Sequence, residues 1–539
     1  MLGWAAAAAE VDRAALLRDH GGGTLRLVAS TAAGSIDPQV NYTGQYWQLF
    51  IAAYDGLVAM RKVQGATGAD VVADLAEAVP VPTDEGRRYV FHLRPGLRFS
   101  DGSLVRPSDA AASFRRMYRV NTPTAGSFYA GILGAADCLR DPTDCALPGV
   151  TADDAAATLT IQLSQADPEF LLKLSLPHAS ILPASAPAHD AGNVPIPGTG
   201  PYVITRYASA SHIRLERNPF FTEWSADAQP QGYPDAIEER FGLADEAEVT
   251  QVQNGQADWM FDAPPADRLG EIGERFADQV HLNPSLAIWL LPMNVREPPF
   301  DDVRVRRAVN YAIDRAAVAK LAGGPRLAMP ACQILPPGIA GHVPYCPYTR
   351  DPGATWSAPD MDRARALVAA SGTAGQTITL VADTSAVQRA IGTYVASVLR
   401  DLGYMTRLRT LSGNVQFTYI QNSDNHVQIS LTQWYSDYPS AYDFLPILFG
   451  CAAFHAGTDS SINISGFCDP VLDARMEQAL AAGPADHDAE WAAIDRAVTD
   501  QAPAAVLFNP VYIDFTARRV QHFVYHDQFH WLADQAWLR

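Results

Sequence analysis

Segments with the period of a β-strand alternate with segments with the period of a helix along much of this chain. Residues 24–30 (TLRLVAS) alternate apolar and polar side chains after a triple glycine, which predicts a strand. A strand over residues 377–381 precedes a helix over 386–402, and a helix over 489–500 precedes a last strand over 504–513. Strands that alternate with helices favour the α/β class, with a parallel or mixed sheet.

Other segments add elements of the same two kinds. Residues 89–99 (YVFHLRPGLRF) predict two strands joined by a turn at Pro95-Gly96, and residues 107–118 predict a helix capped by Ser108. Apolar residues at helical spacing predict one helix over residues 302–321, which Gly323-Gly324 ends. A further strand is expected over residues 427–432.

The chain is long enough for several domains. At roughly 150 residues per domain, 539 residues suggest about three to four. Residues 183–201 contain five prolines and three glycines, a composition that interrupts regular structure, so we expect the chain to cross between domains near residue 191.

Charge and hydropathy exclude some classes of partner. The net charge of −19 repels phosphate backbones, so we expect no nucleic acid partner. No apolar run approaches the ~18 residues that span a bilayer. Residues 1–10 lack a basic start and sufficient apolar length, so we expect that they are not an intact signal peptide.

Six cysteines form three pairs that are close in sequence: Cys138 with Cys145, Cys332 with Cys346, and Cys451 with Cys468. This proximity favours three local disulfides out of the 15 connectivities that six cysteines allow, and disulfides indicate an oxidising compartment. Unpaired buried thiols and a metal site remain alternatives, although no C-x-x-C pair of the zinc-site type is present.

We find no catalytic or metal-binding motif. The chain has no H-E-x-x-H, G-x-S-x-G, P-loop or G-x-G-x-x-G pattern. His522, His526 and His530 are four residues apart, but the intervening segments favour an extended or irregular chain, in which residues i and i+4 lie about 13 Å apart. We therefore expect no metal site here, and no cofactor.

An aromatic cluster around Asp437 is the best candidate for ligand binding. Trp434, Tyr435, Tyr438 and Tyr442 surround this carboxylate in the sequence. Such clusters are more often core than ligand site, but a buried carboxylate needs a cationic partner, and a ligand ammonium would serve.

Several long stretches together resemble the peptide-binding subfamily of bacterial extracytoplasmic solute-binding proteins, family 5, which deliver ligands to ABC importers. The most recognisable block is residues 71–114, which includes VADLAEAV and YVFHLRPGLRFSDGS. The other matching segments are AYDGLV (53–58), PIPGTGPYVI (195–204), RLERNPFF (214–221), PPFDDVRVRRAVNYAIDR (298–315) and DQAPAAVLFN (500–509).

The resemblance implies a bilobal periplasmic-binding-protein fold, type II and cluster C-like, with an extra inserted domain and mixed sheets. Residues 21–58, 192–283 and 502–539 would form a discontinuous domain I, and residues 59–191 an inserted domain II. Residues 284–501 would form domain III, with the ligand cleft between domains I and III. Cys451 and Cys468 are similar to a disulfide pair of dipeptide-binding relatives.

The resemblance also implies roles for particular residues. Asp437 would accept the ligand's α-ammonium, with Trp434 and Tyr435 as walls of the pocket. Backbone groups of Tyr42, Thr43 and Gly44 would pair with the ligand main chain, as in strand addition. Phe128 or Tyr129 would cover the ligand.

The ligand's carboxylate has no obvious partner. Oligopeptide-binding relatives tend to have an arginine three residues before the tryptophan, where this chain has Leu431. Arg389 lies roughly where dipeptide-binding relatives have theirs.

We therefore expect an extracytoplasmic binding protein, in the periplasm or at the cell surface, with a lipid anchor on the full-length form as one option. It would act as a monomer, without catalysis, and pass oligopeptides or another amino-bearing solute to the permease subunits of an ABC importer. The alternatives are a non-peptide ligand (a basic amino acid, an amine metabolite, a nickel complex, haem or a sugar), a hydrolase that uses cleft carboxylates, and a receptor that no longer transports.

Overall fold

The structure, a computed structural model, describes residues 13–265, 267–481 and 484–539, so the expectation for residues 1–10 lies outside the described part. It divides the chain into two compact units. Unit 1 contains the chain up to Val280 together with Asp514–Arg539, and unit 2 contains His281–Ile513. The predicted division of the first part into domain I and an inserted domain II stays a prediction.

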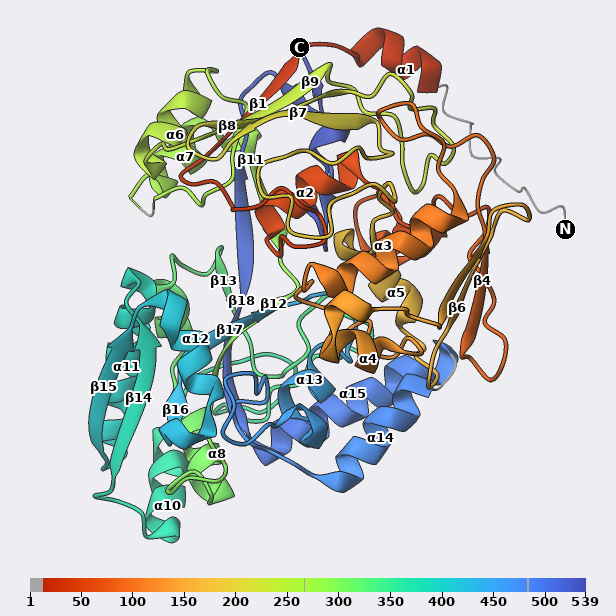
Figure 1. Cartoon of the computed structure of the whole chain (residues 1–539). Coiled ribbons are helices and arrows are strands. Elements are labelled where there is room, and N and C mark those ends of the chain that lie inside the picture. Colours follow the sequence, from red (N-terminus) through yellow and green to blue (C-terminus); the bar gives the residue numbers. More distant parts are fainter. Residues whose placement is uncertain (1–12, 266, 482–483) are drawn as a thin grey trace, which may run out of the picture. The chain divides into compact units, whose positions relative to one another are not determined.

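The main sheet of unit 1 is mixed and begins with the first predicted strand (Figure 1). β1 pairs in parallel with both of its neighbours, while the other two pairings are antiparallel. The strand order is β10 (Trp259–Met260), β1 (Thr24–Ala29), β9 (Ala236–Phe241), β8 (His212–Arg217) and β7 (Tyr202–Ala208).

Helices α6 (Asp245–Gln253) and α7 (Leu269–Arg275) pack against this sheet (Figure 1). Their apolar side chains share a core with residues of β1 and β10 and with two residues from the end of the chain, Phe515 and Ala517. The C-terminal segment is therefore part of the core of unit 1.

The remaining elements of unit 1 are short. One three-stranded sheet has the order β4-β6-β5, and the pairs β2-β3, β19-β22 and β20-β21 form two-stranded sheets. The helices are α1 (Arg13–His20), α2 (Gly44–Ala53), α3 (Pro107–Arg119), α4 (Ala135–Arg140) and α5 (Phe170–Leu174). The strands are β2 (Val58–Met60), β3 (Val71–Ala73), β4 (Arg88–His92), β5 (Val150–Asp153), β6 (Thr158–Gln162), β19 (Val520–Gln521), β20 (Tyr525–His526), β21 (His530–Trp531) and β22 (Trp537–Leu538).

Two sheets organise unit 2 (Figure 1). The first has the order β11 (Val280–Pro284), β18 (Ala504–Phe515), β12 (Ala287–Pro292) and β17 (Thr432–Tyr435), and β13 (Ala328–Pro330) also pairs with β18. The second is parallel, in the order β15 (Met405–Leu411), β14 (Thr377–Asp383) and β16 (Ile429–Ser430). The chain passes between the units within β11 and again within β18, which are neighbouring strands.

Helix α11 (Ala386–Asp401) covers the parallel sheet (Figure 1). Its buried residues Ile391, Val395, Val398 and Leu399 recur at helical spacing and share a core with β14. The other helices of unit 2 are α8 (Val303–Ala312), α9 (Arg315–Leu321), α10 (Met361–Ser371), α12 (Gly413–Gln421), α13 (Leu445–Phe449), α14 (Pro470–Ala481) and α15 (Pro484–Gln501). No helix in the described ranges is both long and apolar enough to cross a bilayer.

Four local predictions were wrong. The strand expected over residues 427–432 is two strands, β16 and β17, which belong to different sheets. The helix expected over residues 302–321 is two helices, because Ile313 is extended and the Asp314 carboxylate caps α9 by accepting the N–H groups of Ala316 and Ala317. Helix α3 is capped by Arg106 with Asp109, because Pro107 occupies its first position. The second strand expected after Pro95-Gly96 is only an isolated bridge, between Arg98 and Leu104.

The three local cysteine pairs form disulfides. Cys138–Cys145, Cys332–Cys346 and Cys451–Cys468 have Cα–Cα distances of 4.5, 4.9 and 4.5 Å. The first lies in unit 1 and the other two in unit 2.

Unit 1 buries several carboxyl groups. Asp55 accepts hydrogen bonds from Thr199 and Gln229, and Asp74 accepts one from the Trp224 indole. Burial raises the pKa of Asp55. The pKa of Asp74 is raised well above its usual value, mainly by burial and to a smaller extent by the negative charge of Asp55. Burial also raises the pKa of Glu239 to about 8.

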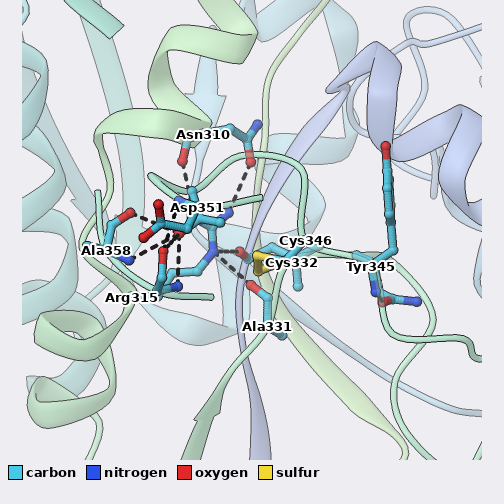
Figure 2. Close-up of a disulfide and its surroundings, with 12 residues drawn as sticks. Asn310, Arg315, Ala331, Cys332, Tyr345, Cys346, Asp351 and Ala358 are labelled. Atoms are coloured by element: carbon cyan, nitrogen blue, oxygen red, sulfur yellow. Dashed lines mark hydrogen bonds between the residues drawn. A yellow bond between two sulfur atoms is a disulfide. The ribbon is translucent and has the colours of Figure 1, made fainter. Parts of the chain in front are cut away.

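Unit 2 buries arginine. Arg315, which follows the break after α8, is fully buried and donates to the carbonyl oxygens of Ala331, Val506 and Asn310 (Figure 2). Burial lowers the pKa of Arg315 to about 10, so it stays charged at neutral pH. Ala331 precedes Cys332 in the sequence. The Cys332–Cys346 disulfide and the hydrogen bond from Arg315 therefore hold the same short segment after β13.

Candidate ligand site

The candidate site in unit 2 lies where edge strand β17 ends. Ile288 of β12 pairs with Trp434, and Ala287 pairs with Tyr435. Beyond the strand, the Ser436 N–H donates to the Leu286 carbonyl at 2.8 Å. Trp434 is half-buried, and Tyr435 is 43% exposed.

Asp437 lies in a loop that a second aspartate holds. The backbone N–H of Asp437 donates to Oδ2 of Asp443 at 2.8 Å, and Asp443 is fully buried. Asp437 itself is half-buried. The loop therefore presents the predicted ammonium acceptor from a fixed backbone, which lowers the entropic cost of binding.

The structure joins the start of α11 to β17 beside Trp434. The amide group of Gln388, which is buried, donates to Gln433 Oε1 at 3.2 Å. Arg389 follows Gln388 and is exposed in the first turn of the helix. Among the described residues, no carboxylate forms an ion pair with Arg389. Arg389 and Trp434 thus extend from two segments that a side-chain hydrogen bond connects.

Leu431, where the resemblance implies an arginine in oligopeptide-binding relatives, is a core residue. Its side chain is buried in the main core of unit 2, and its carbonyl oxygen accepts a hydrogen bond from Gln416 at 3.0 Å. This position is structural.

Trp434 has an indole N–H that is buried and meets no hydrogen-bond acceptor among the described residues. It borders an apolar cavity of about 20 Å³, lined by residues such as Leu290, Phe417 and Phe449. A cavity of this size holds about one water molecule.

The candidate segment in unit 1 follows β1. Asn41, which is buried, uses its side-chain N–H groups to bind the carbonyl oxygens of Ala33 and Ser35. Its Oδ1 accepts both the backbone N–H and the hydroxyl of Thr43. The Thr43 amide is therefore already bonded within the protein.

Tyr42 and Gly44 remain accessible in this segment. Tyr42 is 41% exposed, and its ring lies against Trp47 and His178, with centroids 5.4 and 5.2 Å away. Gly44 begins α2, and a Cβ placed on it would meet no atom within 4 Å. There is thus open space beside the backbone at the start of the helix.

Phe128 and Tyr129 are buried in unit 1. The Tyr129 hydroxyl donates to the Lys173 carbonyl at 2.7 Å, and the Tyr129 carbonyl accepts from Tyr118. Phe128 packs edge-on against Tyr129. These contacts are structural, and the covering role remains a prediction.

The three spaced histidines have separate partners. His522 bonds to the Gln535 carbonyl, His526 to the carbonyls of Arg61 and Gly68, and His530 to Asp514. Burial lowers the pKa of His526 to about 4. Across the part of the chain that the structure describes, no group of three His, Cys, Asp or Glu side chains is arranged to hold a metal ion.

Sequence reasoning missed Asp443, Asn41 and the Gln388–Gln433 bond. Asp443 is only six residues after Asp437, within the same aromatic cluster, so its position gave some signal. Asn41 and the two glutamines act through tertiary contacts that no local pattern reveals.

The family model for bacterial extracellular solute-binding proteins, family 5 (middle region), matches residues 70–456. The chain belongs to this family of solute-binding proteins. The periplasmic oligopeptide-binding protein OppA of Escherichia coli (strain K12) is 25% identical over 497 residues, which cover 86% of each chain. The glutathione-binding protein GsiB of Salmonella typhimurium is 29% identical over 308 residues, 55% of this chain and 54% of that protein.

Solved structures confirm the predicted fold class of this family 5 protein. Clavulanic acid biosynthesis oligopeptide binding protein 2 has a TM-score of 0.86 and 24% identity, with 96% of each chain covered. The periplasmic binding protein DppA of Helicobacter pylori, in complex with the peptide STSA, has a TM-score of 0.74 and 18% identity over 97% of this chain and 99% of that one. The family places the chain outside the cytoplasm and among binding proteins that serve ABC importers.

Proposed function

We propose that this solute-binding protein captures oligopeptides, or a related solute with a free amino group, and delivers them to the permease subunits of an ABC importer without catalysis. Asp437 would accept the ligand ammonium, beside Trp434 and Tyr435. The observation that carries the proposal is the fixed loop around Asp437, whose backbone N–H is bound by buried Asp443.

The relatives support a peptide as the ligand, but they do not identify the ligand of this chain. The oligopeptide-binding protein OppA aligns over most of its length, and the DppA structure contains a peptide. Another relative, 28% identical over 57% of this chain, is named a probable deoxycholate-binding periplasmic protein, so ligands of this family differ.

Arg389 is the candidate partner for the ligand's carboxylate, because Leu431 is part of the core. Tyr42 and the start of α2 at Gly44 would meet the ligand main chain in unit 1. Their open surroundings support this role, whereas the Thr43 amide is already bonded to Asn41.

The first test identifies the ligand. Native mass spectrometry of the purified protein, before and after mild denaturation, should release a peptide or another amine. A non-peptide compound without an amino group would contradict the proposal.

The second test concerns Asp437. Asp437→Asn should weaken the binding of free-amine peptides by about 2–5 kcal/mol in isothermal titration calorimetry, as expected when one partner of a desolvated charge pair is removed. N-acetylated peptides should lose no affinity. Asp362→Asn is a matched control, because Asp362 is an exposed carboxylate of the same unit. Equal losses for free and acetylated peptides would exclude the assigned role.

A third test concerns Arg389. Arg389→Gln should weaken peptides with a free C-terminal carboxylate more than their C-terminal amides, also measured by calorimetry. Unchanged preference between the two would remove Arg389 from the site.

A further inference from the structure

Unit 2 has a groove of about 510 Å³. None of the residues that line it belongs to the Asp437 loop. Its lining includes Tyr311 at the end of α8, Arg363 in α10 and Arg496 in α15, together with Tyr345. Three prolines, Pro344, Pro347 and Pro352, complete the walls. This volume falls within the range of small-molecule sites, about 300–1,000 Å³.

Two arginines of the groove lie over tyrosine rings. The guanidinium carbon of Arg363 lies 4.4 Å from the ring centroid of Tyr311, and that of Arg496 lies 5.4 Å from the ring centroid of Tyr345. A guanidinium in a cation–π contact with a ring can still use its N–H donors to bind a carboxylate in a bidentate manner.

Neither guanidinium group has an ion-pair or hydrogen-bond partner within the described part of the protein. Arg363 and Arg496 form no ion pair with a described carboxylate, and their side chains donate no hydrogen bond to a described acceptor. Some other arginines of unit 2 do form ion pairs: Arg304 pairs with Asp302, and Arg475 pairs with Glu490. The N–H donors of Arg363 and Arg496 are therefore available to a ligand.

The nearby acidic groups already have structural roles. Asp360 caps α10 by accepting the Arg363 backbone N–H, and Asp500 accepts the Tyr345 hydroxyl at 2.7 Å. The latter bond also fixes the ring on which Arg496 lies.

The wall that carries Tyr345 is held rigidly. The Cys332–Cys346 disulfide joins it to the segment after β13, and Gln333 binds the Tyr345 N–H and the Val343 carbonyl. Cys346 and Gly353 also exchange backbone hydrogen bonds, at 2.7 and 3.2 Å. In Figure 2, Tyr345 and the Arg315 network lie on opposite sides of this disulfide.

From these observations we infer that this groove binds a small organic anion with two carboxylate groups, one for Arg363 and one for Arg496. The walls are rigid before binding, so little entropy is lost in ordering them. The proline faces suit an apolar linker between the carboxylates.

The test is a calorimetric titration with linear α,ω-dicarboxylates, from malonate to azelate, at constant ionic strength. We expect saturable binding with an optimum chain length, and a loss of about tenfold or more in affinity for both Arg363→Gln and Arg496→Gln. Arg326→Gln is the matched control, because Arg326 is an exposed arginine of the same unit and does not line the groove. Monocarboxylates of equal length should bind more weakly.

Several outcomes would overturn the inference. They are the absence of saturable binding for every dicarboxylate, an equal loss in Arg326→Gln, and competition by sulfate or chloride at equal concentration, which would indicate a response to charge alone. Arg363→Lys keeps the charge but not the planar fork, so full affinity in this variant would exclude bidentate binding. Thermal unfolding of each variant separates loss of binding from loss of fold.

The same variants separate this groove from the peptide site. Arg363→Gln and Arg496→Gln should leave peptide affinity unchanged, and Asp437→Asn should leave dicarboxylate affinity unchanged. Either site can therefore fail its test while the other passes.

Discussion

The two units of this protein differ in how their most deeply buried ionisable groups are satisfied. Unit 1 encloses Asp55, Asp74 and Glu239, with Lys62 as a buried cation near the two aspartates. Unit 2 encloses Arg315 and Arg306, whose guanidinium groups bind backbone carbonyl oxygens, together with two carboxyl groups, Asp443 and Asp495. Burial is the largest cause of the pKa shifts of the carboxyl groups of Asp55, Asp74, Glu239 and Asp495 and of both arginines.

This difference gives the units different weaknesses. A buried carboxyl group can take up a proton near neutral pH. Unit 1 therefore avoids the cost of burying a negative charge only while its buried carboxyl groups are protonated. Arginine keeps its charge, so unit 2 depends on carbonyl oxygens that must stay in position around it. We therefore expect unit 1 to respond to pH, and unit 2 to respond to loss of its cross-links and acceptors.

The largest expected difference concerns the disulfides. The two bridges of unit 2 join cysteines 14 and 17 residues apart, and that of unit 1 joins cysteines seven apart. In the chain-entropy model, reduction should cost unit 2 about 3 kcal/mol for each bridge, about 6 kcal/mol in total, and unit 1 about 2–3 kcal/mol. Urea unfolding with and without reductant, followed by hydrogen exchange in each unit, measures this. Six titratable thiols in the denatured, non-reduced protein would disprove the bridges.

The next effect concerns Arg315. Arg315→Met should lower the free energy of unfolding of unit 2 by about 3–5 kcal/mol, because several buried carbonyl oxygens lose their donor. Hydrogen-exchange protection should fall in residues 281–513 and remain in unit 1. Arg315→Lys keeps the charge, but its side chain reaches fewer acceptors. The free energy of unfolding of this variant should therefore lie between those of the wild type and Arg315→Met. A uniform loss across both units would contradict the separate roles that we assign to them.

A third effect concerns pH and Glu239. Its pKa is about 8 in the folded protein and about 4.3 in an unfolded chain, so between these values the folded state binds more protons. The stability of unit 1 should therefore fall as pH rises toward 8, by about 1.4 kcal/mol per pH unit for this group. Glu239→Gln should reduce the slope by that amount in urea unfolding from pH 5 to 8. Glu274→Gln, at an exposed position of unit 1, is the control.

The smallest effect concerns Asp495. Burial raises its pKa to about 6, against the hydrogen bonds that it accepts from Gln333, Ile334 and Leu335. Its contribution to the pH slope of unit 2 should end near pH 6, two pH units below that of Glu239. Asp495→Asn should thus change the slope of unit 2 only between about pH 4 and 6. A change of slope between pH 6 and 8 would weaken the comparison.

Elements with a regular period were predictable from the sequence. The strands that begin at Thr24, Thr377 and Ala504 and helix α11 lie close to their expected ranges, because their burial follows their own apolar residues. The break between α8 and α9 was not predictable, because apolar spacing continues across Ile313. What decides it is the Asp314 cap and the Tyr394 hydroxyl, which binds the Asp314 N–H from 80 residues away.

The candidate site was predictable only in its local part. The aromatic cluster indicated Asp437 and its neighbours, since they are contiguous. The support given by Asp443, the bond between Gln388 and Gln433, and the internal use of the Thr43 amide depend on the folded backbone. For the same reason, the cation–π contacts of Arg363 and Arg496 with tyrosines have no sequence signal.

The place of residues 514–539 in the core of unit 1 has a consequence for biosynthesis. Unit 2 is continuous, so all its residues have been synthesised once Ile513 is added. The part of unit 1 that precedes His281 is made first, but unit 1 lacks Phe515, Ala517 and the fully buried Trp531 until residues 514–539 are made. The first unit to be translated is therefore the last that can finish folding. A chain that stops shortly after residue 513 would retain a complete unit 2 beside an incomplete unit 1.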